Sequence, residues 1–205
     1  MPGPLVLLLV LLALAAAAVI GWWLVRRRDD AGPRRPDDVI GDVDKASIDQ
    51  LKQLQVGDII EFGIEKWFVR GSLHLDEHGY TWDEYMLDDA DRKRWLGVEA
   101  DEGFEVTLWE ALAEGDIEQG SPGDRDVIVG AVAYRLQEQG EAAYTAAGST
   151  GTAATGTMRY ADYRAVDGRL LGFENFGSRW EASLGAVVQP WELTVFPSTD
   201  RKGTL

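Results

Sequence analysis

Apolar and polar residues alternate along much of the chain between residues 58 and 196, and this period of two is typical of half-buried β-strands. In residues 66–74, for example, Trp67, Val69 and Leu73 fall on one face. Short polar segments rich in glycine and aspartate separate such runs, as turns separate strands. The pattern predicts an all-β domain of antiparallel β-meanders, closed as a barrel or packed as a two-sheet sandwich.

The domain is predicted to be organised around a β-hairpin over residues 80–99, whose arms carry aromatic and acidic side chains. These are Trp82, Glu84 and Tyr85 on the first arm and Trp95, Leu96 and Glu99 on the second. A shorter version returns over residues 160–174, around an Asp167-Gly168 turn that favours a tight hairpin. The corresponding residues are Tyr85 and Tyr163, Leu96 and Leu171, and Glu99 and Glu174.

Further matched spacings indicate an internal duplication. Two triplets consist of a glycine, an aromatic residue and a glycine, each four positions apart. They are Gly63, Trp67 and Gly71, and Gly140, Tyr144 and Gly148. We predict related meanders over about residues 56–112 and 127–197, with Trp67 and Tyr144 at equivalent positions and with apolar faces that neither meander can bury alone. The alternative is that any meander of short strands gives such spacings.

The core of the domain is predicted from the apolar faces of these strands. Its members are Trp67, Tyr85, Leu96, Val98, Leu171 and Phe173.

The N-terminal region predicts a membrane anchor over residues 1–28. An uncharged apolar run begins at Leu5 and ends at Val25, and at about 1.5 Å per residue it can cross a hydrocarbon core of about 30 Å. Two tryptophans near its end and three arginines directly after it fit the cytoplasmic interface. We therefore expect a single-pass protein of the inner membrane, with its N-terminus outside and its soluble domain in the cytoplasm. A cleaved signal peptide is the alternative.

The segment after the anchor is expected to be a flexible linker over residues 29–46, because it is charged and rich in proline. Ser47 is predicted to cap a short helix that Gly57 closes. The all-β domain is then expected over residues 47–198, and residues 199–205 as a tail.

The composition bounds the function. The chain has 205 residues, no cysteine and a net charge of −15. Disulfides and thiolate sites are therefore excluded, and so acidic a domain should repel nucleic acid. The charge could attract polyamines, metal cations or a basic protein, or it could serve solubility alone.

Candidate chemistry rests on acidic residues of the two hairpins. His74 is placed at the end of a strand and His78 in a turn, rather than both on one helix face, so no metal site is predicted. The candidate ligand-binding residues are Glu84, Tyr85, Trp95, Glu99, Asp162, Tyr163 and Glu174. Carboxylates beside aromatic rings can bind a cation or act as general acid and base. They can also be solvated strand residues, or partners of arginines across the hairpins.

Three sequence motifs resemble a known bacterial family. They are Val56-Gly57-Asp58 with the strand WFVRG, the strand WDEYML at residues 82–87, and Trp95-Leu96. Through these motifs, residues 51–110 of the chain resemble the domain-of-unknown-function family 4178. The second half of the chain resembles this family only loosely. The resemblance implies no established activity. It implies that the protein resembles components of bacterial gene clusters that also encode a polyamine-synthase-like enzyme and small membrane proteins. The resemblance therefore implies a link to polyamines.

These observations predict a non-enzymatic binding or assembly module, held at the membrane without a cofactor and able to meet a membrane-protein partner. A sensor or binder of polyamines or other cations is the first alternative. An enzyme that uses paired carboxylates is the second.

Overall fold

The computed structural model describes residues 40–199, apart from residues 101–102, 114 and 178. The anchor expected between Leu5 and Val25, most of the expected linker and most of the tail lie outside the described residues. Within the described part, no helix is both long enough and apolar enough to cross a membrane.

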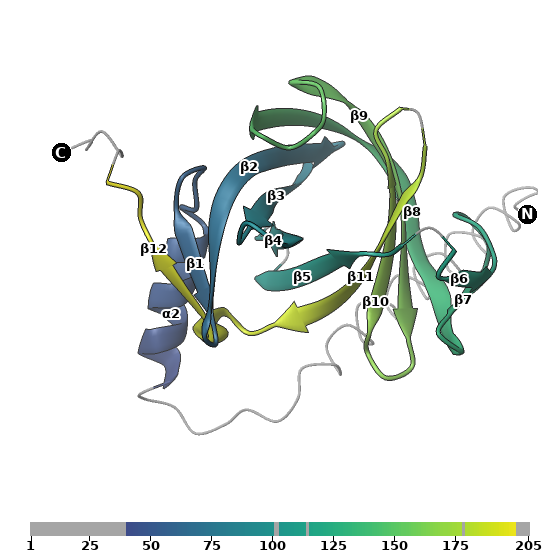
Figure 1. Ribbon diagram of the computed structural model, residues 1–205, viewed down its shortest axis with the longest axis horizontal. Helices are drawn as coiled ribbons and strands as arrows, with labels where there is room; N and C mark the ends of the chain where they lie inside the picture. Colours follow the sequence, from purple (N-terminus) through teal and green to yellow (C-terminus); the bar gives the residue numbers. More distant parts are fainter. Residues whose placement is uncertain (1–39, 101–102, 114, 178, 200–205) are drawn as a thin grey trace, which may run out of the picture. The chain divides into compact units, whose positions relative to one another are not determined.

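The described chain consists of one helix, one 3₁₀ turn and β-strands, as Figure 1 shows. The elements are α2 (Ile40–Leu51), β1 (Ile59–Phe62), β2 (Glu65–Glu77), β3 (Tyr80–Asp88), β4 (Lys93–Glu99), β5 (Glu105–Ala111), β6 (Ile117–Gln119), β7 (Asp126–Val129), β8 (Val132–Gly148), β9 (Thr155–Ala165), β10 (Leu170–Asn175), β11 (Glu181–Val188), η1 (Pro190–Glu192) and β12 (Leu193–Phe196).

Across the described residues these strands form one twelve-stranded antiparallel sheet that closes on itself. Its order is β12-β1-β2-β3-β4-β5-β11-β10-β9-β8-β7-β6, and a further pairing joins β2 to β8. Eight of the described strands, β2 to β5 and β8 to β11, therefore make a closed antiparallel barrel. β12 and β1 extend it beyond β2, and β7 and β6 extend it beyond β8. The barrel alternative of the sequence prediction is confirmed.

The barrel is built from two consecutive meanders of four strands, β2 to β5 and β8 to β11, joined along β5–β11 and β2–β8. The β2–β8 seam begins where Gly71 pairs with Gly148. A Cβ atom on Gly71 would lie 2.6 Å from the carbonyl oxygen of Ser149, and one on Gly148 would lie 2.4 Å from that of Arg70. The seam therefore needs glycine at both positions.

The predicted correspondence between the two hairpins is confirmed by their register. Tyr85 pairs with Leu96 in the first hairpin, as Tyr163 pairs with Leu171 in the second. Each hairpin also pairs an aromatic residue with a glutamate. These pairs are Trp82 with Glu99 and Tyr160 with Glu174.

The predicted equivalence of Trp67 and Tyr144 is wrong. Trp67 pairs with Ile60 of β1, before β2 reaches β3. Tyr144 instead pairs with Leu75 at the β2–β8 seam. Each of β2 and β8 has a β-bulge that shifts its register, one near Gly71 and one near Glu138. A bulge adds only one residue to a strand, so the bulges do not explain the error. Trp67 lies five residues before Ser72, the partner of Tyr85, whereas Tyr144 lies eight residues after Leu136, the partner of Tyr163.

A helix-side cluster of buried residues covers the outer face of the first meander. It includes Leu51, Leu54, Ile60, Trp67, Val69, Tyr85, Leu87, Leu96, Val98, Val106, Val188, Leu193 and Val195. α2, β1 and β12 therefore cover the outside of β3, β4 and β5. The predicted core positions Trp67, Tyr85, Leu96 and Val98 are confirmed as buried.

The helix differs from its prediction at both ends. It begins at Ile40, inside the segment expected to be a flexible linker, and it ends at Leu51. Ser47 thus lies within the helix and does not cap it. Gly57 lies beyond the helix, with a φ of 97° that favours glycine.

Asp58 connects the segment after α2 to the segment after β12. Its side chain is fully buried and accepts hydrogen bonds from the backbone nitrogens of Gln55 and Ser198, at 2.9 Å and 2.8 Å. The Val-Gly-Asp motif therefore has a structural role, because it anchors the strand end after β12 beside the turn after α2.

A β7-side cluster covers the outer face of the second meander in the same way. It consists of Val127, Val129, Tyr134, Ala161, Tyr163, Ala165, Leu171 and Phe173. The predicted burial of Leu171 and Phe173 is confirmed. A third, inner cluster fills part of the barrel, and its buried members are Leu73, Leu75, Ala142, Tyr144, Met158 and Tyr160.

Candidate functional site

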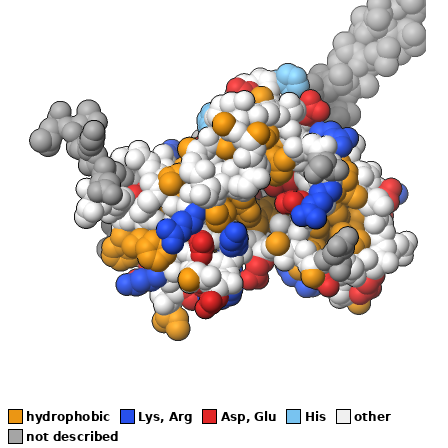
Figure 2. Space-filling model, turned by 45° about the horizontal axis from the view of Figure 1, so that its top comes forward, with side chains coloured by type: hydrophobic (Ala, Val, Ile, Leu, Met, Phe, Trp, Pro, Cys, Tyr) orange, Lys and Arg blue, Asp and Glu red, His pale blue; other side chains and the backbone are white. Residues whose placement is uncertain are grey.

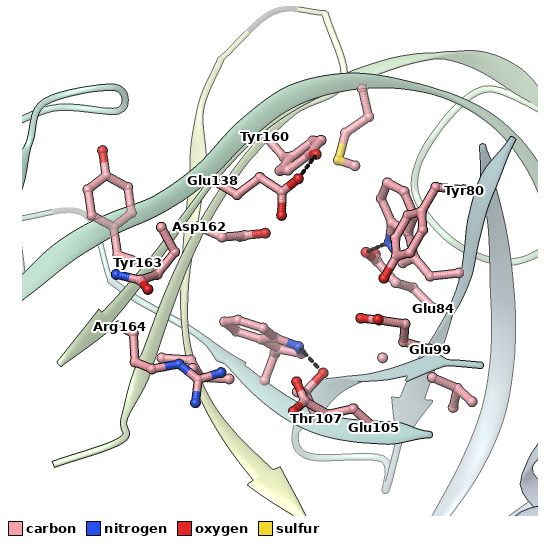
Figure 3. A pocket seen from close by; sticks show the side chains of 17 residues that line it. Tyr80, Glu84, Glu99, Glu105, Thr107, Glu138, Tyr160, Asp162, Tyr163 and Arg164 are labelled. Carbon is pink, nitrogen blue, oxygen red and sulfur yellow. Dashed lines mark hydrogen bonds between the residues drawn. The ribbon is translucent and has the colours of Figure 1, made fainter. Parts of the chain in front are cut away.

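A cavity of about 260 Å³ lies inside the barrel, between β3, β4 and β5 on one side and β8, β9 and β10 on the other (Figure 3). Successive residues of a strand point to opposite faces, so the residues that alternate with the outer clusters face this cavity. The acidic residues that line it are Glu84, Glu99, Glu105, Glu138 and Asp162. Among the described residues lining the cavity, Arg164 alone is basic.

Aromatic rings form much of the remaining wall. The indole nitrogen of Trp82 donates a hydrogen bond to Oε1 of Glu84 at 3.0 Å. The Trp82 ring meets the ring of Tyr160 edge to face, with centroids 5.9 Å apart, and it lies 6.0 Å from the ring of Tyr80. On the other side, the indole of Trp109 donates to the Thr107 hydroxyl at 2.8 Å. The Glu84 carboxylate is thus fixed by an indole N–H, and the neighbouring rings pack against one another.

Glycines opposite the acids keep the cavity open. Glu84 pairs across the sheet with Gly97, and Asp162 pairs with Gly172. A Cβ atom on Gly97 would lie 2.5 Å from Oγ1 of Thr107, and one on Gly172 would lie 3.4 Å from Oδ1 of Asp162. Any larger residue at either position would therefore take space beside the carboxylates.

The deepest carboxyl groups hold protons more tightly than usual. Burial raises the pKa of Glu84, although the hydrogen bonds from Trp82 and with Glu174 oppose this shift. Burial, together with the nearby charges of Glu84 and Asp162, raises the pKa of Glu174 well above its ordinary value. The two carboxyl groups are hydrogen-bonded to each other, so one of them carries the proton between them.

Asp162 has a carboxyl group that titrates near neutral pH. Burial, then the charges of Glu84 and Glu138, raise its pKa to about 7. Its side chain is partly buried and lines the cavity. The interior of the barrel therefore changes its charge in the physiological pH range.

Charged residues with solvent access mark the opening of the cavity. Burial and the charge of Glu99 raise the pKa of Glu105, and the charge of Arg164 opposes this shift. The hydroxyl of Tyr160 donates to Oε2 of Glu77 at 2.5 Å and lies 3.4 Å from Oε1 of Glu138. In Figure 2 the surface is hollowed on one face, where acidic and hydrophobic side chains are both visible.

The structure brings some of the predicted site residues together and separates others. Glu84, Glu99 and Asp162 line the cavity. Trp95 and Glu174 line a second cavity, of about 320 Å³. Tyr85 does not join either cavity, because its ring is buried in the helix-side cluster. Tyr163 borders the first cavity, but its ring belongs to the β7-side cluster and its hydroxyl accepts a hydrogen bond from Gly123 N at 2.8 Å.

Several lining residues were missed by the sequence prediction, and the alternation of the strands carried the signal for them. Val106 lies on the outer face of β5, so its neighbours Glu105 and Thr107, and with them Trp109, must face inward. Tyr160 shares the inward face of β9 with Asp162 for the same reason. Glu138 gave no such signal, since it follows the bulge in β8.

Of the four arginines suggested as partners of these carboxylates, Arg164 lines the cavity and its charge acts on Glu105, whereas the other three bind elsewhere. Arg92 pairs with Asp89 and Glu65, Arg94 with Glu110 and Glu65, and Arg169 with Asp167. Within the described part of the chain, no ion pair involves Glu84, Glu99, Asp162 or Glu174. Protons held by the buried carboxyl groups and the charge of Arg164, rather than ion pairs to these four acids, therefore reduce the negative charge of the cavity.

Comparison with known proteins shows which family the chain resembles in sequence. The model of a family described as "Domain of unknown function (DUF4178)" matches residues 55–190. The chain belongs to this family. Its relatives include the uncharacterised protein Rv2597 of Mycobacterium tuberculosis (strain H37Rv) and the uncharacterised protein Mb2628 of Mycobacterium bovis, each 34% identical over 155 residues. Each alignment covers 72% of this chain and 73% of the relative.

The family match extends beyond the region where the sequence motifs were clear, and it spans both meanders of the barrel. No solved structure matches the chain.

Proposed function

We propose that the barrel of this DUF4178 protein is a binding module for small organic cations that carry amine groups. The observation that carries the proposal is the cavity inside the barrel, where Glu84, Glu99, Glu105, Glu138 and Asp162 surround a space of about 260 Å³. This volume suits a small molecule rather than a single ion, and the wall combines apolar rings with a few polar groups, as ligand sites commonly do.

The aromatic wall favours an organic cation over a bare metal ion. An ammonium group over the face of an aromatic ring gains about 0.5 to 2 kcal/mol, and Tyr80, Trp82, Trp109 and Tyr160 all line the cavity. Among the described residues, no group of three His, Cys, Asp or Glu side chains is arranged to hold a metal ion. An amine can use both the carboxylates and the ring faces.

Internal duplication is part of the proposal. The matched registers of the two hairpins, with Glu84 opposite Gly97 and Asp162 opposite Gly172, support a common origin of the two meanders. In this view, one ancestral hairpin supplied an acid and a facing glycine, and its two copies now face each other across one cavity.

The location at the cytoplasmic face of the inner membrane also remains a proposal, supported by the apolar run from Leu5 to Val25 and the arginines that follow it. A membrane-protein partner would then reach the barrel from the same surface. Alkaline phosphatase fused after Leu205 should be inactive, and an active fusion would place the barrel on the other side of the membrane.

Calorimetric titration of the purified full chain with spermidine tests the binding function. We expect saturable binding that weakens between about 0.05 M and about 0.5 M salt, because screening shortens the range of charge interactions. Asp162→Asn and Glu99→Gln should each weaken binding about tenfold or more. Glu61→Gln is the matched control, because it removes one negative charge from β1, where Glu61 lies 3.5 Å from Lys66 and outside the cavity.

Equal weak heats for the wild type, the two cavity variants and the control would contradict the proposal. That result would mean that amines condense on an acidic surface without a specific site.

A further inference from the structure

The second cavity lies beside the first, and its chemistry is similar. It has a volume of about 320 Å³. Trp95 and Phe176 supply its aromatic surface, and Glu174 and Glu181 supply its carboxylates. The loop between β8 and β9 covers it with Thr150 and its neighbours. This cavity therefore combines carboxylates and aromatic rings as the first does, although Arg179 also lines it. It is formed by the β8–β9 loop, by single residues of β4, β10 and β11, and by the connection between β10 and β11.

A single pair of carboxyl groups connects the two compartments. Glu84 lines the first cavity and Glu174 lines the second. The two side chains are hydrogen-bonded to each other. They come from different meanders, Glu84 from β3 and Glu174 from β10, so the contact crosses the interior of the barrel. The wall between the cavities thus includes, at this point, two buried carboxyl groups whose pKa values are both raised.

We propose that the two cavities are the two ends of one site for an elongated oligoamine, with the Glu84–Glu174 pair at its middle. The inference rests on the proposed function and specifies its ligand. One amine group lies in each cavity, and the chain between them passes the carboxyl pair. The shared proton leaves for the solvent as the ligand enters, and an ammonium group of the ligand takes its place between the two carboxylates.

The charges around the pair support this exchange. The groups that act on it are the carboxylates of Asp162 and Glu181, in addition to the Trp82 indole that donates to Glu84. Carboxyl groups from several strands therefore lie close enough to raise the pKa of Glu174, and protonation lowers the repulsion among them. A cation that bridges the pair relieves the same repulsion, and it allows both groups to be ionised.

Glu181 offers a way to test the far end of the site. Its side chain is 61% exposed, and its carboxylate lies 3.4 Å from the Arg179 guanidinium. An exposed pair of this kind adds little to stability, so Glu181→Gln is expected to fold normally. It removes one carboxylate from the second cavity and leaves the first cavity unchanged.

The experiment compares amines of increasing length on the full chain by calorimetry. The probes are propane-1,3-diamine, spermidine, spermine and, as a compact cation, tetramethylammonium. We expect spermine to bind at least tenfold more tightly than propane-1,3-diamine. Glu181→Gln should weaken spermine about fivefold and leave the diamine unchanged, whereas Asp162→Asn should weaken both. Titrations in buffers of different ionisation enthalpy should show proton release with spermine.

The outcomes separate this inference from the proposed function. If the diamine binds as tightly as spermine, or if Glu181→Gln changes both or neither, the two cavities do not form one site, and only the inference is overturned. If none of the amines binds, or if Asp162→Asn has no effect on any of them, the proposed function fails as well.

Discussion

The two faces of the barrel wall have opposite chemistry. On β10, Leu171 and Phe173 point outward into an apolar cluster, whereas Glu174 points inward toward other carboxylates. On β9, Tyr163 belongs to the outer cluster and Asp162 lines the cavity. A small barrel usually fills its interior with apolar side chains. Here much of the apolar packing lies outside, under α2, β1 and β12 on one side and under β7 on the other.

This difference separates stability from function. The outer clusters remove large apolar surfaces from water, which is the main favourable term in folding. The interior is then free to hold charges that would weaken an apolar core. The inner cluster around Leu73 and Tyr144 fills only part of the barrel. We therefore expect substitutions on the two faces of the same strand to have opposite effects.

The largest effect is expected from neighbouring residues of β10. Phe173 is 1% exposed, and truncation of such a buried aromatic residue to alanine should lower the free energy of unfolding by about 3 to 5 kcal/mol. Glu174→Gln, one position further along, should leave stability unchanged or raise it, because an amide can donate to Glu84 without having to bind a proton at pH 8. Denaturant titration of both variants at pH 8 measures the contrast. A cost for Phe173→Ala below about 0.5 kcal/mol would show that the outer cluster does not hold the barrel together.

The next effect is a pH dependence of stability at Asp162. An unfolded aspartate has a pKa of about 3.9, and in the folded barrel the pKa is raised to about 7. The folded state therefore binds more protons between these values, and the contribution of Asp162 to stability is lost as pH rises through about 4 to 7. Asp162→Asn should raise the free energy of unfolding by roughly 2 to 4 kcal/mol at pH 8 and change it little at pH 4.

Thermal unfolding of the ligand-free protein across this pH range measures the effect. An Asp162→Asn variant that is no more stable than the wild type at pH 8 would mean that the carboxylate is well solvated within the cavity.

A smaller effect is expected where a glycine lets a ring lie against the wall. A Cβ atom on Gly185 of β11 would lie 2.4 Å from Cε3 of Trp109, so Gly185→Ala must push the indole into the cavity. Overpacking of this kind costs about 1 to 3 kcal/mol, and it should also weaken amine binding. Gly103→Ala is the matched control, since a Cβ atom there meets no atom within 4 Å. Equal unfolding temperatures for the two variants would show that Trp109 moves aside freely.

The smallest effect is expected at the opening of the cavity. Glu138 is exposed, and exposed charges contribute less than about 1 kcal/mol because water and salt screen them. Glu138→Gln should therefore weaken spermidine binding two- to fivefold at low salt, and the difference should vanish at high salt. A loss that persists at high salt would show that Glu138 contacts the ligand directly inside the cavity.

The sequence predicted the outer face of the barrel better than its inner face. Trp67, Val98 and Phe173 were recognised as core because apolar alternation carries a strong signal for burial. Glu84, Glu99 and Asp162 were found through the repeated hairpins. Their convergence depends on closure of the ring between β2 and β8, a contact that alternation does not encode.

The errors have related physical causes. Tyr85 sits beside Glu84 in the sequence, yet adjacent residues of a strand face opposite ways, and its burial separates it from the cavity. The match between Trp67 and Tyr144 failed because the two residues lie on opposite sides of the positions that pair with Tyr85 and Tyr163, which the spacing of glycines and aromatic residues does not reveal. Helix α2 begins earlier than expected, because the apolar residues before Ser47 were too few to indicate a helix.

The two seams of the ring also bear on how the chain folds as it is made. The ribosome releases β2 to β5 before β8 to β11 exist, so the first half emerges with the strand edges of β2 and β5 unpaired. Such edges can template pairing with another chain. The second half of any copy presents the same complementary edges, and two nascent chains held close together can each complete the other. Local concentration on the ribosome would then set the balance between closed monomers and interlocked dimers.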